Sequence, residues 1–262
     1  MGVKHILTLK GKRKIAVLTA YDFPTAKLVD EADLDIVLVG DSVGMVCLGY
    51  ESTLPVTMAD MLHHTRAVKR AIKRALIVTD MPFGSYRNVG SAVKNAKALT
   101  YEGGADAVKL EGGRDILSEV KAIVRTGIPV MGHLGMLPQS IRELGGYKVQ
   151  GKTREESDRI FEEAIELERA GIFSLVLECV PDSLAKRVTK RLKIPTIGIG
   201  AGPATDGQVL VFHDVLGLES PVSPRFVRRY ADLSSMIRKA LARYRSDVLT
   251  GKFPAKKETF KG

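Results

Sequence analysis

Six ionisable side chains stand at or near the ends of apolar, strand-like runs in this sequence. In chain order they are Asp41, Asp80, Lys109, Glu111, His133 and Glu178. A charge among apolar side chains costs free energy unless it is paired or bound to a metal ion. Packing alone explains this repeated pattern poorly, so it indicates an enzyme active site.

Three of these side chains, Asp41, Asp80 and Glu111, are carboxylates that converge if the runs lie side by side. Left bare, they would repel one another and raise each other's pKa. A divalent cation relieves that conflict, and oxygen-only ligands favour Mg²⁺ or Mn²⁺ over Zn²⁺. The alternative is that each carboxylate caps a helix or pairs with a lysine. For three together we favour a site for one of these metal ions.

Lys109 lies two residues before Glu111, so both side chains share one face of a strand. There Lys109 can bind an anionic group of a substrate, form a Schiff base, or make a structural ion pair with Glu111. Nearby carboxylates would keep the ammonium protonated and unreactive. We therefore expect a substrate-binding lysine.

His133 and Glu178 are candidates for proton chemistry. His133 can act as a base, as a hydrogen-bond donor or as a buried structural histidine; near a metal ion we expect a neutral ring that donates to substrate. Glu178 follows an apolar strand with no basic residue before Lys186, which suits a general base. Its alternative is a capping partner for a helix that starts near Pro181.

Eight short apolar runs rich in Val, Ile and Leu alternate with helical stretches along the chain. These runs are 15–20, 35–41, 75–80, 106–112, 128–134, 174–179, 194–200 and 209–217. Nearly continuous apolar runs are typical of strands buried on both faces of a parallel sheet. The pattern predicts an α/β protein with a (β/α)8 barrel, whose active site lies at the strands' C-terminal ends. An open doubly wound sheet is the alternative.

Helix signals divide the chain without indicating a linker. Thr153 and Glu156 form a capping box for a helix over 154–170. Ser223 and Pro224 indicate the start of a basic C-terminal helix. We expect one domain over 1–262, with the basic helix and tail from about 224. The connections 42–56 and 135–152 follow strands and are candidate lids over the site.

Composition excludes several classes of protein. The chain has 262 residues, of which 45% are hydrophobic and 27% charged, which is typical of a globular protein rather than a disordered or fibrous one. No apolar run reaches the roughly 20 residues of a membrane span. Two cysteines make no disulfide framework, so we expect a cytoplasmic protein. The net charge of +10 admits a nucleic-acid-binding protein, but no aromatic residues interleave with the basic runs.

Motifs around these residues resemble the ketopantoate hydroxymethyltransferase family over about 13–230. The segments that carry the resemblance include GDSVG (40–44), VTDMPFGSY (78–86), KLEGG (109–113), PVMGHLGMLPQS (129–140) and LVLECVP (175–181). The resemblance implies a barrel of the phosphoenolpyruvate/pyruvate type. It also implies transfer of a hydroxymethyl group from 5,10-methylenetetrahydrofolate, or a related pterin, to 3-methyl-2-oxobutanoate. The product is 2-dehydropantoate, on the route to pantothenate and coenzyme A.

Matched motif by motif, the resemblance assigns a role to each candidate residue. Asp41, Asp80 and Glu111 would coordinate Mg²⁺, and Glu178 would accept the proton. The substrate-binding residues would be Asp41, Ser42, Asp80 and Lys109, to which our own analysis adds His133. The family also implies a homodecamer. A related magnesium-dependent lyase or mutase acting on a 2-oxo acid or phosphoenolpyruvate is the alternative function.

Overall fold

Eight parallel strands close into a barrel in the computed structural model, which describes residues 2–140, 148–218 and 224–260. The strands pair in chain order, β1 with β2 through to β8 with β1. Their bounds are β1 Ile15–Thr19, β2 Ile36–Val39, β3 Leu76–Asp80, β4 Ala107–Glu111, β5 Val130–Gly135, β6 Ser174–Glu178, β7 Thr196–Ile199 and β8 Gly207–Leu210. The predicted (β/α)8 fold is therefore confirmed.

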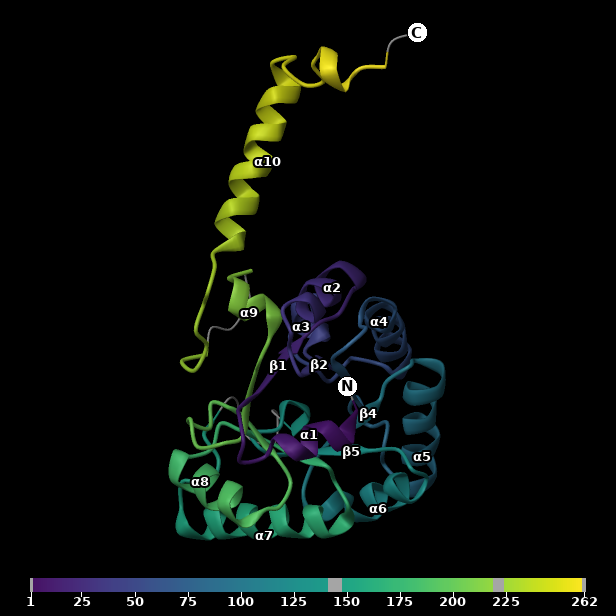
Figure 1. Ribbon diagram of the computed structural model, residues 1–262, viewed down its shortest axis with the longest axis vertical. Helices are drawn as coiled ribbons and strands as arrows, with labels where there is room; N and C mark the ends of the chain where they lie inside the picture. The colour runs from purple at the N-terminus through teal and green to yellow at the C-terminus, as the bar shows by residue number, and fades with distance from the viewer. Residues whose placement is uncertain (1, 141–147, 219–223, 261–262) are drawn as a thin grey trace. The chain divides into compact units, whose positions relative to one another are not determined.

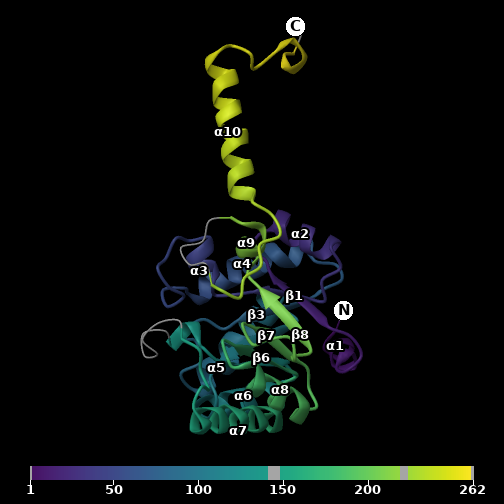
Figure 2. The same ribbon diagram turned by 90° about the vertical axis from the view of Figure 1, so that its left-hand side faces the viewer.

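Helices follow the strands and form the outer layer of the barrel, as Figure 1 shows for α4 to α8. The helix bounds are α1 Val3–Leu9, α2 Phe23–Glu31, α3 Val43–Val46, α4 Met58–Ala71, α5 Val89–Lys97, α6 Leu117–Arg125, α7 Arg154–Ala170, α8 Asp182–Arg191, α9 Phe212–Leu216 and α10 Leu233–Leu249. Seen from the side, β6 and β7 lie inside the layer made by α6 to α8 (Figure 2). None of the described helices is long and apolar enough to cross a membrane.

Local sequence explains where these helices begin and end. The Thr153 hydroxyl accepts a hydrogen bond from Glu156 N at 3.2 Å, and Glu156 bonds back to Thr153 N, which is the predicted capping box of α7. α7 ends at Gly171, whose φ of 100° favours glycine. The predicted bounds 154–170 are thus confirmed.

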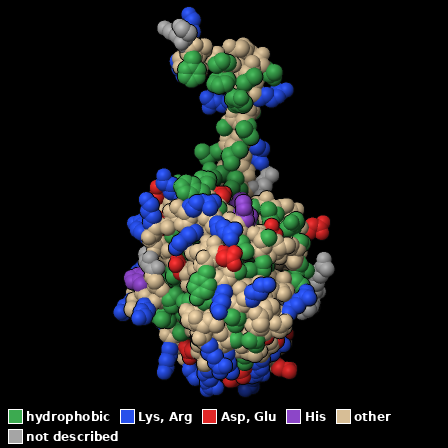
Figure 3. All heavy atoms as spheres, turned by 90° about the vertical axis from the view of Figure 1, so that its right-hand side faces the viewer, with side chains coloured by type: hydrophobic (Ala, Val, Ile, Leu, Met, Phe, Trp, Pro, Cys, Tyr) green, Lys and Arg blue, Asp and Glu red, His purple; other side chains and the backbone are tan. Residues whose placement is uncertain are grey.

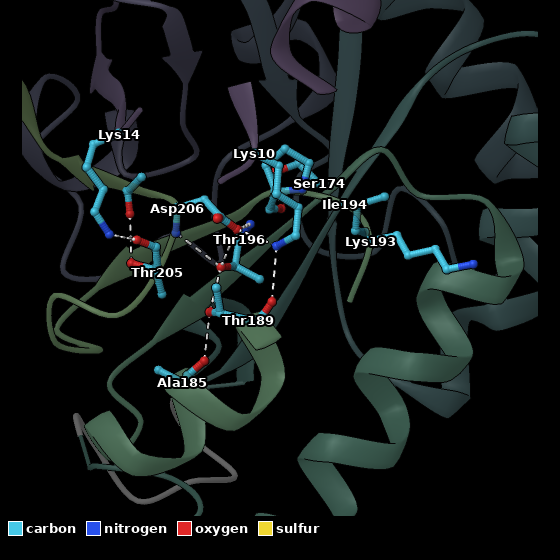
Figure 4. Close-up of polar contacts among 12 residues, drawn as sticks. Lys10, Lys14, Ser174, Ala185, Thr189, Lys193, Ile194, Thr196, Thr205 and Asp206 are labelled. Atoms are coloured by element: carbon cyan, nitrogen blue, oxygen red, sulfur yellow. Dashed lines mark hydrogen bonds and ion pairs between the residues drawn. The ribbon is translucent and has the colours of Figure 1, made fainter. Parts of the chain in front are cut away.

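The N-terminal end of the barrel is closed by α1. Ile6 and Leu9 of α1 are buried in one cluster with inward-facing strand residues such as Val17 and Leu76. Polar contacts fasten the same end (Figure 4): Lys10 Nζ lies 2.7 Å from Asp206 Oδ2, which also accepts a hydrogen bond from a backbone N–H of β7. Because this end is filled, the opposite end is the one that can hold a site.

Two sequence expectations about the last part of the chain are wrong. The apolar run 209–217 is not one strand, because β8 ends at Leu210 and α9 begins at Phe212. A short apolar run suits either structure, so periodicity alone could not separate them. The C-terminal helix begins at Leu233 rather than near 224, since the Asp232 carboxylate caps it by accepting from Ser235 N. Ser223 lies outside the described residues.

The chain divides into two compact units, Met1–Phe212 and His213–Gly262. The first contains the whole barrel, and the second contains most of α9 together with α10. That both belong to one domain stays a prediction.

Candidate active site

The predicted site residues meet at the C-terminal mouth of the barrel. Asp80, Glu111 and Glu178 are the last residues of β3, β4 and β6, and Asp41 follows β2. Parallel pairing sets Asp80 beside Lys109, and Glu111 beside His133. All six ionisable side chains are buried. The barrel thus gathers at one mouth the groups that the sequence scatters over more than a hundred residues.

Lys109 is the positive centre of the carboxylate cluster. Its Nζ lies 2.8 Å from Asp80 Oδ1 and 3.6 Å from Glu111 Oε1. Burial alone would lower the pKa of Lys109, but Asp80, Glu111 and Asp41 outweigh it and raise that pKa. The lysine is therefore held as an ammonium, which opposes a Schiff base and agrees with an anion-binding role.

His133 lies between two carboxylates. Its Nδ1 is 3.3 Å from Glu111 Oε1 and its Nε2 is 3.3 Å from Glu178 Oε2. Burial and the Lys109 charge oppose protonation, but the two carboxylates outweigh them and raise the pKa of His133 to about 9. The two carboxylates thus favour the protonated imidazole, and the neutral ring expected beside a bound metal ion stays a prediction.

Glu178 is not the isolated carboxylate that the sequence suggested, because His133 faces it. Nor does it cap the following helix: α8 begins after Pro181 with no side-chain cap. The Glu178 side chain keeps a small exposed fraction of 11%, compared with 4% or less for Asp80, Lys109, Glu111 and His133. It is thus the most open of these five to an incoming molecule.

Asp41 and Asp80 face each other across the ends of β2 and β3. Asp41 N donates to Asp80 Oδ2 at 3.1 Å. Burial, together with the charges of Glu111 and Asp80, raises the pKa of Asp41 well above its usual range. Burial also raises the pKa of Asp80, although Lys109 opposes the shift. Two crowded carboxylates that resist ionisation form a place where a cation would be stabilised.

The pKa of Glu111 shifts in the opposite direction from the pKa values of the two aspartates. Burial opposes its ionisation, but His133, Lys109 and a backbone N–H outweigh burial and lower the pKa of Glu111. That N–H belongs to Gln139 and donates to Glu111 Oε2 at 3.1 Å. Glu111 is therefore ionised and already faces donors on both of its oxygens.

Ser42 lies at the edge of the same cluster. Its hydroxyl oxygen is 2.8 Å from the hydroxyl of the buried Tyr21 at the end of β1. Gly40 leaves room for it, since a Cβ at position 40 would lie 2.8 Å from Ser42 Oγ and 3.5 Å from Asp80 Oδ2. Ser42 therefore lies beside the carboxylates, and its contact with substrate stays a prediction.

Sequence reasoning missed Gln139, Tyr86 and Tyr21. The Gln139 side chain donates to Asp41 Oδ2 at 2.8 Å, and its Oε1 accepts from the Tyr86 hydroxyl at 2.7 Å. The site was predicted from charged residues at the ends of apolar runs, and neutral polar residues such as these do not stand out in that pattern. For Gln139 and Tyr86 the one available signal was their presence in two family-like motifs, PVMGHLGMLPQS and VTDMPFGSY.

The donor set suits a hard cation in part. Asp80 Oδ1 and Glu111 Oε1 are buried and lie 2.8 Å and 3.6 Å from Lys109 Nζ, so a cation would share these oxygens with the ammonium. In the ranges that the structure describes, however, no three His, Cys, Asp or Glu side chains are arranged to hold a metal ion together. Mg²⁺ does not require such a cage, because it commonly binds one or two carboxylates and completes its shell with water and substrate.

Comparison with known proteins identifies the family. The family model for ketopantoate hydroxymethyltransferase matches residues 1–256. The chain belongs to this family. A 3-methyl-2-oxobutanoate hydroxymethyltransferase of Thermoanaerobacter sp. (strain X514) is 56% identical over 252 residues, covering 96% of this chain and 92% of the relative. The enzyme of that name from Thermus thermophilus is 51% identical over 258 residues, covering 98% of each.

Solved structures of distant proteins share the barrel of this hydroxymethyltransferase family member. Phosphoenolpyruvate phosphomutase from Streptomyces platensis subsp. rosaceus has a TM-score of 0.64 at 13% identity, covering 100% of this chain and 92% of its own. Phosphonopyruvate hydrolase in complex with oxalate and Mg²⁺ has a TM-score of 0.64 at 14% identity, covering 98% and 93%. At such identities the likeness shows the barrel fold alone. Membership of the transferase family makes the protein an enzyme.

Proposed function

We propose that this protein transfers a hydroxymethyl group to 3-methyl-2-oxobutanoate, giving 2-dehydropantoate for pantothenate and coenzyme A synthesis. The observation that carries the proposal is the buried charge cluster of Asp41, Asp80, Lys109 and Glu111, with the His133–Glu178 pair beside it, at the mouth of the barrel. Relatives that bear the name of this activity are more than half identical over nearly the whole chain.

Asp41, Asp80 and Glu111 are proposed to hold one Mg²⁺. The two aspartates, which resist ionisation while they face each other, would bind the ion most directly. Glu111 would complete the acidic wall around it. When bound, the ion acts as a Lewis acid that stabilises negative charge on the keto oxygen. A fold neighbour, phosphonopyruvate hydrolase, was solved with oxalate and Mg²⁺, and oxalate presents two adjacent oxygens as a 2-oxo acid does.

Lys109, Ser42, Asp41, Asp80 and His133 are proposed to receive the keto acid. The Lys109 ammonium would neutralise the substrate carboxylate, and the Ser42 hydroxyl would donate to it. His133 would donate to a substrate oxygen. Its Nε2 would stay beside Glu178, 3.3 Å away, while its Nδ1 would exchange the 3.3 Å contact with Glu111 for the substrate oxygen.

Glu178 is proposed to be the general base. It would take the proton from C3 of the keto acid, leaving the electron pair as an enolate. One water would be consumed to open the methylene bridge of the donor, so that both carbon–nitrogen bonds break and the carbon is released at the formaldehyde level. C3 would then add to that carbon, and the alkoxide formed, whose oxygen comes from the water, would take the proton back from Glu178 to give the hydroxymethyl group. His133, 3.3 Å from Glu178 Oε2, fixes the orientation of the base. The donor is proposed to be 5,10-methylenetetrahydrofolate or a related pterin.

We also propose a cytoplasmic homodecamer. Neither Cys47 nor Cys179 forms a disulfide, which suits a reducing compartment. Exposed apolar residues of α10, among them Leu241 and Tyr244, supply a surface for self-association. Small molecules are the only other partners proposed, and nucleic acid and membranes have no place in this proposal.

The deciding experiment is an assay of hydroxymethyl transfer with and without EDTA. We expect activity that requires both a divalent cation and the one-carbon donor. A related lyase or mutase would turn over a 2-oxo acid or phosphoenolpyruvate without that donor. The double variant Asp41→Ala/Asp80→Ala should lose metal-dependent activity. If calorimetry still finds tight Mg²⁺ binding in that variant, the ligand assignment is wrong.

A further inference from the structure

We infer that Gln139 is a positioning residue that holds Asp41 and Glu111 in the orientation in which they face the cation site. The inference rests on the proposed function, because it takes these carboxylates as the acidic wall of that site. Gln139 belongs to the short helical turn Pro138–Ser140 in the connection after β5. It is buried, with an exposed fraction of 6%.

Gln139 donates hydrogen bonds from its side-chain amide and from its backbone amide to residues at the ends of other strands. Its Nε2 donates to Asp41 Oδ2 at 2.8 Å and to Met81 O at 3.0 Å. Its backbone N donates to Glu111 Oε2 at 3.1 Å. Gln139 therefore holds two carboxylates that are distant in the chain. Asp41, which follows β2, is 98 positions away, and Glu111, which ends β4, is 28 positions away.

Tyr86 acts together with Asp41 and Met81 to determine which way the Gln139 amide points. The Tyr86 hydroxyl donates its one hydrogen to the nearer acceptor, Gln139 Oε1 at 2.7 Å, rather than to Glu111 O at 3.1 Å. A flipped amide would turn its oxygen toward the Asp41 carboxylate and the Met81 carbonyl, where acceptor would face acceptor. The Gln139 donors are therefore directed to Asp41.

The segment that carries Gln139 is tied to the opposite side of the mouth. Met136 N donates to Glu178 O at 2.8 Å, and Gln150 N donates to Cys179 O at 2.9 Å. The connection after β5 is thus anchored to the end of β6, while Gln139 reaches the ends of β2 to β4. Fixed partners of this kind orient carboxylate ligands, and their loss typically costs 10–100-fold in metal affinity or activity.

The test is Mg²⁺ binding to Gln139→Leu, measured by titration calorimetry, with thermal unfolding measured alongside. Leucine keeps the approximate volume and removes the side-chain donors. We expect Mg²⁺ to bind about 10–100-fold more weakly than to the wild type. The matched control is Gln150→Leu, because the Gln150 amide donates only to Lys148 O among the described contacts. That control should bind Mg²⁺ as the wild type does.

A merely structural role would lower the unfolding temperature of Gln139→Leu and leave Mg²⁺ affinity unchanged, which would overturn the inference. Tyr86→Phe is the second variant, since it removes the hydroxyl that orients the amide. It should weaken Mg²⁺ binding by a smaller factor. If Gln139→Leu does not fold, unchanged affinity in Tyr86→Phe overturns the inference. A wild-type chain that binds no Mg²⁺ overturns the proposed function, and the inference with it.

Discussion

At the scale of single residues, the mouth of the barrel is an alternation of charges. Lys109 lies between Asp80 and Glu111, and His133 lies between Glu111 and Glu178. Each cation therefore serves two carboxylates, which lets buried acids stay close together without full mutual repulsion. Asp41 shares in neither of these ion pairs, and this makes its neighbourhood the natural place for a metal ion.

Glu178→Gln tests the assignment of the base. The amide keeps the size of the side chain but cannot accept the C3 proton, so exchange of that proton into D₂O should fall by about 10²–10⁴-fold. Binding of the keto acid and of Mg²⁺ should remain near the wild-type level, as measured by calorimetry. Exchange that persists at the wild-type rate would falsify the base role.

The sequence was sufficient to locate the charged residues, because the ends of apolar runs in a parallel barrel meet at one mouth. It could not give their protonation states. The raised pKa of His133 depends on Glu111 and Glu178, which come from two other strands. Gln139 was missed for a related reason: its contacts are long-range, and nothing in its local pattern distinguishes it from an ordinary loop residue.

At the scale of elements, the close approach of β5 and β6 places His133 and Glu178 together. Gly135 ends β5 with a φ of 102°, and a Cβ at this position would lie 2.1 Å from Glu178 O. Only glycine allows the two strands to meet in this way. The 3.3 Å contact between the His133 and Glu178 side chains therefore depends on a glycine at position 135, which is the register partner of Glu178.

Gly135→Ala should displace the end of β5 or β6 and separate His133 from Glu178. We expect a stability loss well above the roughly 1–2 kcal/mol that the backbone conformation alone costs an L-residue, and a clear fall in kcat. Gly127→Ala is the control, because its φ is 85° but nothing lies within 4 Å of the added Cβ. That variant should lose a little stability and no activity, by thermal unfolding and steady-state kinetics. Equal effects of the two substitutions would contradict this reasoning.

Asp35 links the beginnings of β1 and β2. Its buried carboxylate accepts from Ala16 N at 2.9 Å and from Arg13 Nη1 at 2.8 Å. Burial opposes ionisation, but Arg13 and the Ala16 N–H outweigh it and lower the pKa of Asp35. A lowered pKa stabilises the fold above the unfolded-state pKa of about 3.9. This stabilisation is lost as the pH falls through the folded-state value.

Asp35→Asn should therefore be less stable than the wild type at pH 7, by about 1–3 kcal/mol, and the difference should shrink in acid. Urea unfolding at pH 7 and near pH 3 measures both values. Asp33→Asn is the control: its carboxylate pairs with Arg74 at 2.6 Å but is 74% exposed, so about 0–1 kcal/mol is expected. A constant difference at both pH values would show that charge is not the cause.

Element bounds were predictable where capping chemistry is local, as with Thr153 and Glu156 of α7. They were not predictable where apolar residues continue across a boundary. Phe212 extends the apolar run of β8, yet its N–H donates to Thr19 Oγ1 of β1, and a helix begins there. That contact joins residues 193 positions apart, so it leaves no trace in the local sequence.

At the scale of the whole molecule, one end of the barrel stabilises the fold and the other end carries the candidate active site. The N-terminal end is filled by α1 and fastened by the Lys10–Asp206 ion pair, whereas the C-terminal end carries the buried charges of the site. This separation is typical of (β/α)8 barrels, in which stability and chemistry are assigned to opposite faces. Substitutions at Lys10 or Asp206 should therefore lower the free energy of unfolding and leave the catalytic rate unchanged.

The helix α10 has the features of a surface that is covered in an assembly. It has no buried residue, and Ile237, Leu241, Tyr244 and Val248 are exposed at helical spacing; Figure 3 shows apolar side chains along it. Such a stripe is expected to be buried against another surface.

Leu241→Glu should shift the protein toward smaller species, because it places a charge in the middle of an apolar stripe that self-association would bury. Light scattering after size-exclusion chromatography measures the mass of the wild type and the variant. Ser246→Glu is the matched control: it adds the same charge to α10, about 140° around the helix from Leu241 at roughly 100° per residue. The control should keep the wild-type mass. If both variants keep it, α10 is not an assembly surface, and the proposed homodecamer would have to form through the barrel.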